Sequence, residues 1–241
     1  MKGIKYKQII IIKMKKVKFI AMVALMAVSL TASAQSATTS VDKGWSTFWF
    51  QWSPSKTKSD IADFNKISFT GLSLGYSRAF SVSPTIPLYL EAGLGAQYSF
   101  NKDTDHYEVD GSGFYVTKKH NVLSARVPVN LMYKWDIPYS KFSLMPYFGV
   151  NFRFNILAKE NRERTDVVNG VILSTEKRKA DCFDDDEVEK TWKRFQGGWE
   201  LGFKVAYDNK YQLGIAWGKD FNDFAHNTKA KYTNITLGYM F

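Results

Sequence analysis

The sequence predicts an all-β fold, a transmembrane antiparallel up-and-down β-barrel of eight strands, and three observations support this. Apolar and polar residues alternate along most of the chain beyond its N-terminal segment, as they do in strands with one apolar and one polar face. The connections between these segments are alternately short and long, and the number of segments is even. Aromatic residues gather near both ends of the apolar faces, as they do at the two interfaces of a bilayer.

The predicted strands are eight segments that share this alternation to different degrees. They cover residues 44–52, 66–80, 88–101, 114–135, 142–157, 193–207, 211–221 and 229–241. The first of them, GWSTFWFQW, is aromatic but alternates poorly, so its place in the barrel is open. Pro128 and Pro146 fall inside predicted strands, and because proline has no N–H to donate, each is expected to mark a bulge or a strand end.

The composition of the two faces distinguishes a membrane barrel from a soluble one. A soluble barrel carries Lys and Glu on its outward face, whereas here the polar face is rich in Gly, Ser, Asn and Ala and has few charges. Small polar residues suit the crowded lumen of an eight-stranded barrel. We therefore expect the apolar face to contact lipid. Its aromatic residues form two predicted girdles, Phe80, Trp135, Phe142, Tyr207, Tyr211 and Phe241 at one end and Tyr98, Phe100, Phe154, Phe195 and Trp217 at the other.

The N-terminal segment has the pattern of an export signal. Residues 1–34 contain seven lysines and no acidic residue, and an apolar stretch from Phe19 to Leu30 precedes the small residues Ala32-Ser33-Ala34. This pattern predicts a secretory signal peptide cleaved before Gln35, with Met14 as an alternative start. The apolar stretch is too short to span a bilayer comfortably, which argues against a transmembrane anchor. The mature barrel would then comprise residues 35–241.

Most of the net positive charge of the chain comes from this predicted signal. The chain has 33 Lys and Arg against 23 Asp and Glu, and without the seven N-terminal lysines 26 basic residues face 23 acidic ones. The mature protein is thus nearly neutral, and no nucleic-acid partner is expected. Its single cysteine, Cys182, excludes an internal disulfide.

The alternation of connection lengths predicts the orientation in a Gram-negative outer membrane. Three short connections, SVSPTIP, DIPYSK and DNK, would face the periplasm together with both termini, and the longer ones would be extracellular. The longest loop is expected at about residues 158–192. Within it, Asn169-Gly170 between β-branched residues predicts a two-stranded hairpin, which either offers an edge to a protein partner or only stiffens the loop.

Five charged residues fall on the predicted lumen face, where unpaired charges are costly. They are Glu91, Arg126, Arg153, Glu200 and Lys204. Both signs occur on neighbouring strands, so we expect an internal ion-pair network that fills the lumen. An ion pathway is the alternative, but an eight-stranded lumen is narrow for one.

Other residues with chemical potential give weaker signals. The acidic run Asp181–Glu189 lacks the spacing and the glycine of a calcium loop, so a solvated loop without a metal is expected. His106, His120 and His226 lie in or beside predicted outer loops, and Ser124 follows His120 by four residues but belongs to the lumen face. Some outer-membrane barrels that act on lipid A use a His and a Ser, yet no hydrolase or metal motif is present. We expect no enzyme activity, no cofactor and no nucleophilic role for Cys182.

Two hairpins resemble a known family. LSARVPVNLMYKW followed by FSLMPYFGVNFRF, and then GGWELGFKVAYDNKYQLGIAWG, resemble the outer-membrane β-barrel proteins of Bacteroidota known as the PorT-like group. The resemblance implies an eight-stranded barrel of the OmpA/OmpX type and no single activity. It also implies that the C-terminal aromatic strand, with Tyr239 and Phe241, is the recognition signal for the barrel assembly machinery.

The expected function is therefore envelope structure and surface interaction through the extracellular loops. Outer-membrane lipid and lipopolysaccharide are the expected surroundings, and a protein partner could dock on the 158–192 loop. The alternatives are an accessory subunit of an envelope or secretion complex, as the PorT-like resemblance suggests, and a lipid A-modifying enzyme.

Overall fold

The structure is a computed structural model that describes residues 43–59, 67–109, 112–184, 192–225 and 228–241. The predicted signal peptide, residues 1–34, lies outside the described residues. The strands are β1 (Ser46–Ser59), β2 (Ser68–Ser81), β3 (Leu88–Val109), β4 (Ser112–Tyr133), β5 (Trp135–Asp136), β6 (Phe142–Val168), β7 (Val171–Asp181), β8 (Phe195–Tyr207), β9 (Tyr211–Asp220) and β10 (Thr228–Met240). Among the described residues, no helix is long and apolar enough to cross a membrane.

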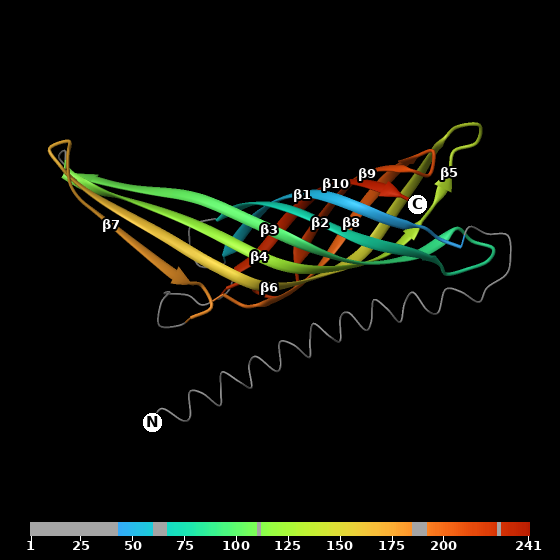
Figure 1. Cartoon of the computed structure of the whole chain (residues 1–241), viewed down its shortest axis with the longest axis horizontal. Helices are drawn as coiled ribbons and strands as arrows, with labels where there is room; N and C mark the ends of the chain where they lie inside the picture. Colours follow the sequence, from blue (N-terminus) through green and yellow to red (C-terminus); the bar gives the residue numbers. More distant parts are fainter. Residues whose placement is uncertain (1–42, 60–66, 110–111, 185–191, 226–227) are drawn as a thin grey trace, which may run out of the picture. The chain divides into compact units, whose positions relative to one another are not determined.

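Eight of these strands form a closed antiparallel ring (Figure 1). Its order is β1-β2-β3-β4-β6-β8-β9-β10, and the pairing of β10 with β1 closes it. β5 continues β4 over two residues, and β7 pairs with β6 alone. The predicted fold class, an all-β eight-stranded barrel, is confirmed.

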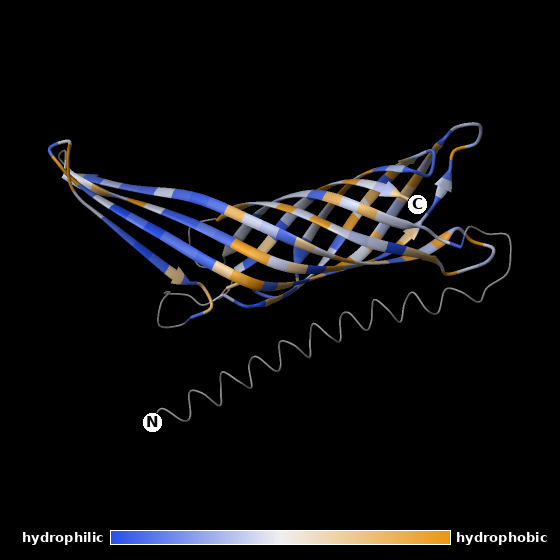
Figure 2. Cartoon of the chain, viewed as in Figure 1, coloured by the Kyte–Doolittle hydropathy of each residue, from blue (hydrophilic) through white to orange (hydrophobic). Residues whose placement is uncertain are grey.

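The outward and inward faces divide as the alternation predicts. Figure 2 shows the alternation of hydrophobic and hydrophilic residues along the strands. Large apolar side chains such as Leu74, Phe148 and Leu213 are exposed on the outside, each by more than half of its surface. The inside is lined by buried serines, asparagines and glutamines together with the charged residues. Since a lipid-facing surface must be apolar while the lumen must be filled, this division is that of a membrane barrel.

The first strand is a full member of the ring although its sequence alternates poorly. Phe48, Phe50 and Trp52 point outward, whereas Trp49 points into the lumen and is buried. The Trp49 indole lies against a neighbouring strand where a glycine leaves room, because a Cβ at Gly75 would stand 2.3 Å from the ring. The segment 44–52 therefore alternates poorly in sequence because the inward-facing residue Trp49 is aromatic, like its outward-facing neighbours.

The two prolines open gaps in single ladders without shifting the register. β3 and β4 pair from Leu88↔Tyr133 to Ala92↔Val129 and resume at Gly95↔Arg126, so the pairing is interrupted opposite Pro128. Pro146 pairs with Phe203 of β8 and lies where β4 gives way to β5. The expectation of a bulge or a strand end is thus wrong at Pro128, whereas Pro146 lies within β6 opposite the end of β4. The bulge between β4 and β6 lies instead at Leu123/Ser124.

Three ring strands, β3, β4 and β6, continue beyond the ring and form a projecting sheet together with β7 (Figure 1). The sequence predicted strand ends near residues 101, 114 and 157. Instead, β3 extends to Val109, β4 begins at Ser112 and β6 extends to Val168, and β7 pairs with β6. Asn169 and Gly170 form the predicted tight turn, with φ of 50° and 78°. The predicted two-stranded hairpin is thus formed by β6 and β7, which make up two of the four strands of the projecting sheet. Residues 158–168 and 171–181 of the expected loop are strand.

The C-terminal residue takes part in closing the ring. The Ser46 N–H donates to the Phe241 carbonyl at 2.8 Å, and the Phe241 N–H donates to the Ser46 carbonyl at 2.9 Å. The Phe241 ring stacks on Phe48 with centroids 5.4 Å apart and lies 6.3 Å from Tyr239. These contacts lie at the end of the barrel opposite the projecting sheet (Figure 1).

Deleting Phe241 should lower assembly in cells far more than it lowers the stability of refolded protein. The deletion removes two backbone hydrogen bonds at a strand end that water can reach, whereas the resemblance above implies that assembly depends on a terminal aromatic. Heat-modifiable gel mobility of membrane fractions and of protein refolded in detergent measures both quantities. Normal amounts of folded deletion variant in the membrane would show that Phe241 is only an interfacial anchor.

Candidate functional site

The lumen contains all five charged residues that the sequence predicted there. Glu91 and Lys204, on β3 and β8, form an ion pair with 2.6 Å between Oε2 and Nζ, and both side chains are buried. The Glu91 carboxylate also accepts hydrogen bonds from Ser77 Oγ at 2.9 Å and from Asn130 Nδ2 at 2.9 Å. All the atoms of this pair that carry charge are thus engaged across four strands.

The other three predicted charges are held by partners that the sequence did not reveal. Arg153 pairs with Asp220 of β9 at 2.5 Å. Arg126 donates to Ser73 Oγ at 3.2 Å and lines one cavity together with Glu200, which accepts from Asn234 at 3.1 Å. With Asp220 included, these lumen residues comprise three acids and three bases, so their charges balance. Asp220 lies inside the predicted strand 211–221 on the same face as Gln212 and Gly218, so the alternation contains a signal for its place in the lumen that the prediction did not use.

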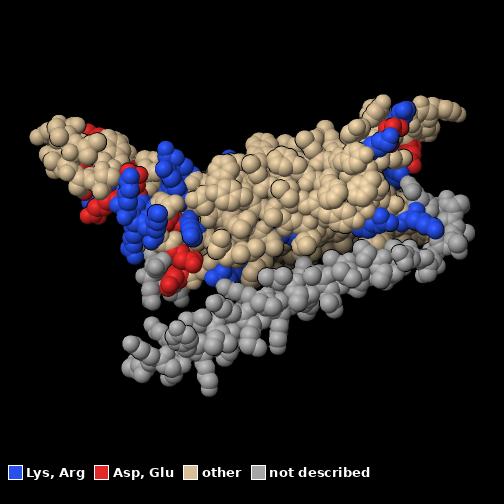
Figure 3. Space-filling model, in the orientation of Figure 1, with Lys and Arg blue, Asp and Glu red and all other residues tan. Residues whose placement is uncertain are grey.

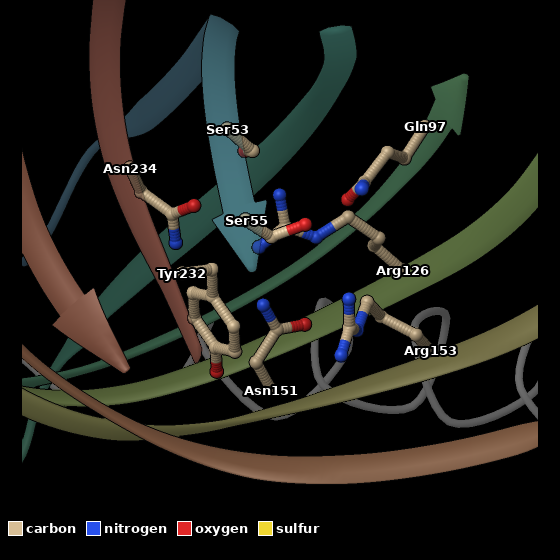
Figure 4. Close-up of a pocket in the computed structure, with 8 residues that line it drawn as sticks. All are labelled: Ser53, Ser55, Gln97, Arg126, Asn151, Arg153, Tyr232 and Asn234. Carbon is tan, nitrogen blue, oxygen red and sulfur yellow. The ribbon is translucent and has the colours of Figure 1, made fainter. Parts of the chain in front are cut away.

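Two small cavities lie between these side chains. One, of about 10 Å³, lies beside Arg126, Arg153 and Tyr232, and the second, of about 30 Å³, lies beside Glu91, Lys204 and Glu200 (Figure 4 shows the first). The remaining residues that point into the first cavity are Ser53, Ser55, Gln97, Asn151 and Asn234. Such volumes hold one or a few water molecules and no larger ligand. The geometry is that of a filled, charge-balanced lumen.

An aromatic cluster, which we call the mouth plug, closes the lumen below the projecting sheet. Trp192 lies 4.3 Å from Phe224 and 5.9 Å from Phe69 between ring centroids. The other buried members are Val122, Ala158, Cys182 and Ala225. Cys182 also holds the plug through its backbone, because its N–H donates to Ala158 and its carbonyl accepts from Trp192. The periodicity of the sequence does not predict this cluster, because its members come from strands and connections that are far apart in the sequence.

A hydrogen-bonded histidine packs under the mouth plug. The His120 ring stacks on Trp192 at 5.2 Å, and its Nε2 and Nδ1 lie 3.1 Å from Glu160 and 3.3 Å from Asn101. This hydrogen bond from His120, together with nearby positive charges, lowers the pKa of Glu160. Burial raises the pKa of the Cys182 thiol to about 12, so the thiol stays protonated at neutral pH and unreactive.

The structure separates the remaining candidate residues. Ser124 donates to Asn155 within the lumen, while His120 is engaged by Glu160, so the two form no nucleophile–base pair. His106 lies near the end of the projecting sheet, where Glu108 contacts it at 2.9 Å, and His226 lies outside the described residues. Most of the acidic run Asp181–Glu189 also lies outside them. Within the described residues, no group of His, Cys, Asp and Glu suits a metal ion.

The end of the projecting sheet, which we call the tip, is apolar and exposed. Its large side chains are Tyr107, Tyr115, Val168, Val171, Ile172 and Leu173. A hollow of about 360 Å³ opens on one face, between the stacked rings of His106 and Tyr115 and the side chains of Val167 and Ile172. The sheet below the tip, here called the stalk, carries charged residues of both signs (Figure 3). Among the described residues, the outer edges of β3 beyond Phe100 and of β7 pair with no other strand.

The family is shown by a comparison of the sequence with family models. The model described as the outer membrane protein beta-barrel domain matches residues 20–241. The chain belongs to this family. It is an outer-membrane β-barrel protein, and its site in the cell is the outer membrane. No match was found among the curated proteins.

Solved structures of outer-membrane barrels align with most of the chain at low identity. The attachment invasion locus protein Ail of Yersinia pestis is 12% identical, with 83% of this chain and 100% of that chain covered and a TM-score of 0.39. Neisserial surface protein A is also 12% identical, with coverages of 81% and 97% and a TM-score of 0.37. The translocator domain of the autotransporter NalP from Neisseria meningitidis is 8% identical, with coverages of 94% and 98% and a TM-score of 0.30.

Replacing Lys204 by Met should destabilise this outer-membrane barrel by about 3–5 kcal/mol, because it leaves the buried Glu91 carboxylate without its counter-ion. The double variant Glu91→Gln with Lys204→Met should recover most of that loss. Unfolding in denaturant, followed by tryptophan fluorescence in lipid vesicles, measures both. The control is Lys141→Met, which breaks an exposed pair with Asp208 and should cost less than about 1 kcal/mol. A single variant as stable as this control would contradict an ion-paired lumen.

Acidification should loosen the mouth plug through Glu160. Because folding lowers the pKa of this carboxyl below its ordinary 4.5, its contribution to stability is fully present above that value and is lost as the pH falls through the lowered one. The protection of the Trp192 amide, which donates to the Cys182 carbonyl, against hydrogen exchange should therefore fall in acid when measured relative to the intrinsic exchange rate at each pH. Glu160→Gln should remove most of this dependence, and a variant with an unchanged pH profile would contradict the assignment.

Proposed function

We propose that this protein is a non-enzymatic outer-membrane β-barrel that acts at the cell surface through its projecting sheet. The observation that carries the proposal is the tip, an exposed apolar surface held away from the barrel by a charged stalk. Because the lumen is filled by side chains, the barrel serves as an anchor in the membrane and not as a channel. Binding through the tip is then the function that this geometry supports best.

The proposal places the projecting sheet outside the cell and the chain ends in the periplasm. The connections 82–87, 137–141 and 208–210 are short and lie at the same end as Phe241, while the long strands leave the opposite end (Figure 1). Outer-membrane barrels have short periplasmic turns and longer extracellular connections. The lengths of the connections therefore support this orientation.

The position of the tip supports contact with a macromolecule. Val171 and Leu173 are exposed by 62% and 65%, and the other large exposed side chains of the tip are also apolar or aromatic. The stalk that separates them from the lipid-facing surface carries Arg164, Lys177 and Glu163, among others, and a charged segment does not enter a bilayer. Exposed apolar patches on the aqueous side mark interaction sites, and an open strand edge beside such a patch can add a strand from a partner.

Two narrower functions remain as alternatives. The PorT-like resemblance of the hairpins 123–135 with 142–154 and 197–218 favours an accessory subunit of an envelope or secretion complex, for which the tip would be the docking surface. A lipid A-modifying enzyme finds less support, because His120 and Ser124 are engaged by other residues. Partners that copurify with the protein would favour the subunit, whereas a shift in the mass of lipid A on overproduction would favour the enzyme.

Replacing Ile172 and Leu173 by Thr should abolish partner binding without affecting insertion. Threonine keeps the preference for strand and removes most of the apolar surface. Crosslinking on intact cells followed by extraction in mild detergent measures the partners retained by the wild type and the variant. The matched control, Glu163→Gln with Lys177→Gln, removes an exposed ion pair of the stalk and should retain the partners. If the tip variant retained the same partners as the wild type, the proposed role of the tip would be wrong.

A further inference from the structure

Three lysines on adjacent strands face each other on the outer surface of the barrel. Lys56 of β1 is directly opposite Lys231 of β10, and Lys231 is directly opposite Lys219 of β9. Lys229 follows on β10, two residues closer to the end that carries the projecting sheet. We call the first three the lysine row. Like charges directly opposite each other destabilise a sheet, so this arrangement calls for a counter-charge.

No acidic side chain of the described residues neutralises the row. No described acidic side chain makes an ion pair with a lysine of the row or with Lys229. By contrast, Lys177 of the stalk lies 3.5 Å from Glu163. Asp220, the residue next to Lys219, points into the lumen and is taken by Arg153. Within the part of the chain that the structure describes, the lysine row is therefore a concentrated positive charge without an acidic partner.

The row lies at the boundary of the lipid-facing surface. Lys219 follows Trp217 by two residues on the same face of β9, and Lys56 follows Trp52 by four residues on the same face of β1. Trp217 and Trp52 are both exposed on the outside, as aromatic residues of a bilayer interface are. Lysine side chains just beyond such a girdle reach the level of lipid headgroups.

We propose that the lysine row binds the phosphate groups of an anionic lipid whose headgroup carries two phosphates. Neighbouring strands are about 4.8 Å apart, so the outer two lysines of the row are separated by roughly 10 Å. One phosphate can contact two adjacent ammonium groups, but a second phosphate is needed to engage the whole row. The proposal is independent of the tip, and the proposed orientation enters only in assigning the lipid to the outer leaflet.

Binding of such a lipid is tested with the full chain in nanodiscs of zwitterionic phosphatidylcholine. One set contains a small fraction of a lipid with two phosphates on its sugar headgroup, and a second set contains the same lipid with one phosphate removed. The affinity for each lipid is measured by native mass spectrometry for the wild type and for Lys56→Gln with Lys219→Gln and Lys231→Gln. The control, Lys141→Gln with Lys177→Gln and Lys210→Gln, has the same change in net charge but alters lysines that have acidic partners.

The wild type and the control should bind the two-phosphate lipid on the order of 100-fold more tightly than the row variant, given the typical contribution of each lysine near a lipid surface. Removal of one phosphate should weaken binding to the wild type but not to the row variant. The row variant should be at least as stable as the wild type in zwitterionic lipid alone, since it loses like-charge repulsion, and this shows that it is folded.

Equal affinity of the row variant and the wild type would overturn the proposal. Equal binding of the one-phosphate and two-phosphate lipids by the wild type would overturn the assignment of the ligand class. Competition by dissolved pyrophosphate at the concentration of the lipid would show that the row binds a free anion, and the lipid would then be the wrong source of the phosphates.

Discussion

The pairing of β1 with β10 is the interaction on which the rest of the structure depends. A strand edge left open in hydrocarbon would expose unpaired N–H and C=O groups at several kcal/mol each, so a sheet in a bilayer must close on itself. The ladder from Thr47↔Met240 to Ser59↔Thr228 performs this closure, and it brings the last residue of the chain against Ser46. Once the ring is closed, every side chain of these strands must face either lipid or lumen.

Closure of only eight strands also determines what the lumen can do. The interior is just wide enough for side chains, and some bulky ones occupy space that a glycine leaves open, as Trp49 does at Gly75 and Gly95 and Tyr232 at Gly218. Charges in so confined a space need partners, and Glu91, Lys204, Arg153 and Asp220 supply them to one another. The lumen is thereby filled by side chains, and the surfaces available for recognition lie on the outside of the ring and on the projecting sheet.

The sequence predicted the ring better than it predicted the features built on the ring. Alternation is strong where one face meets lipid, so seven strands could be placed directly, whereas the inward Trp49 obscured the first. In the projecting sheet both faces meet water, and segments such as 102–109 and 159–166 have no apolar face to mark them as strands. The partners of Arg153 and His120 depend on the register between strands, and the lysine row depends on it as well. Such contacts cannot be read from a single strand.

The closure in this register can be tested directly with a disulfide between the first and last strands. Phe50 and Leu237 are directly opposite on the lipid-facing side, at a spacing that a disulfide can bridge. In a Cys182→Ser background, cysteines at these two positions should crosslink within one folded chain in the membrane. Cysteines at Phe48 and Ile235, which face lipid but are not opposite each other, should not crosslink. Absence of the first crosslink, or its appearance only between two chains, would contradict a barrel closed by β1 and β10.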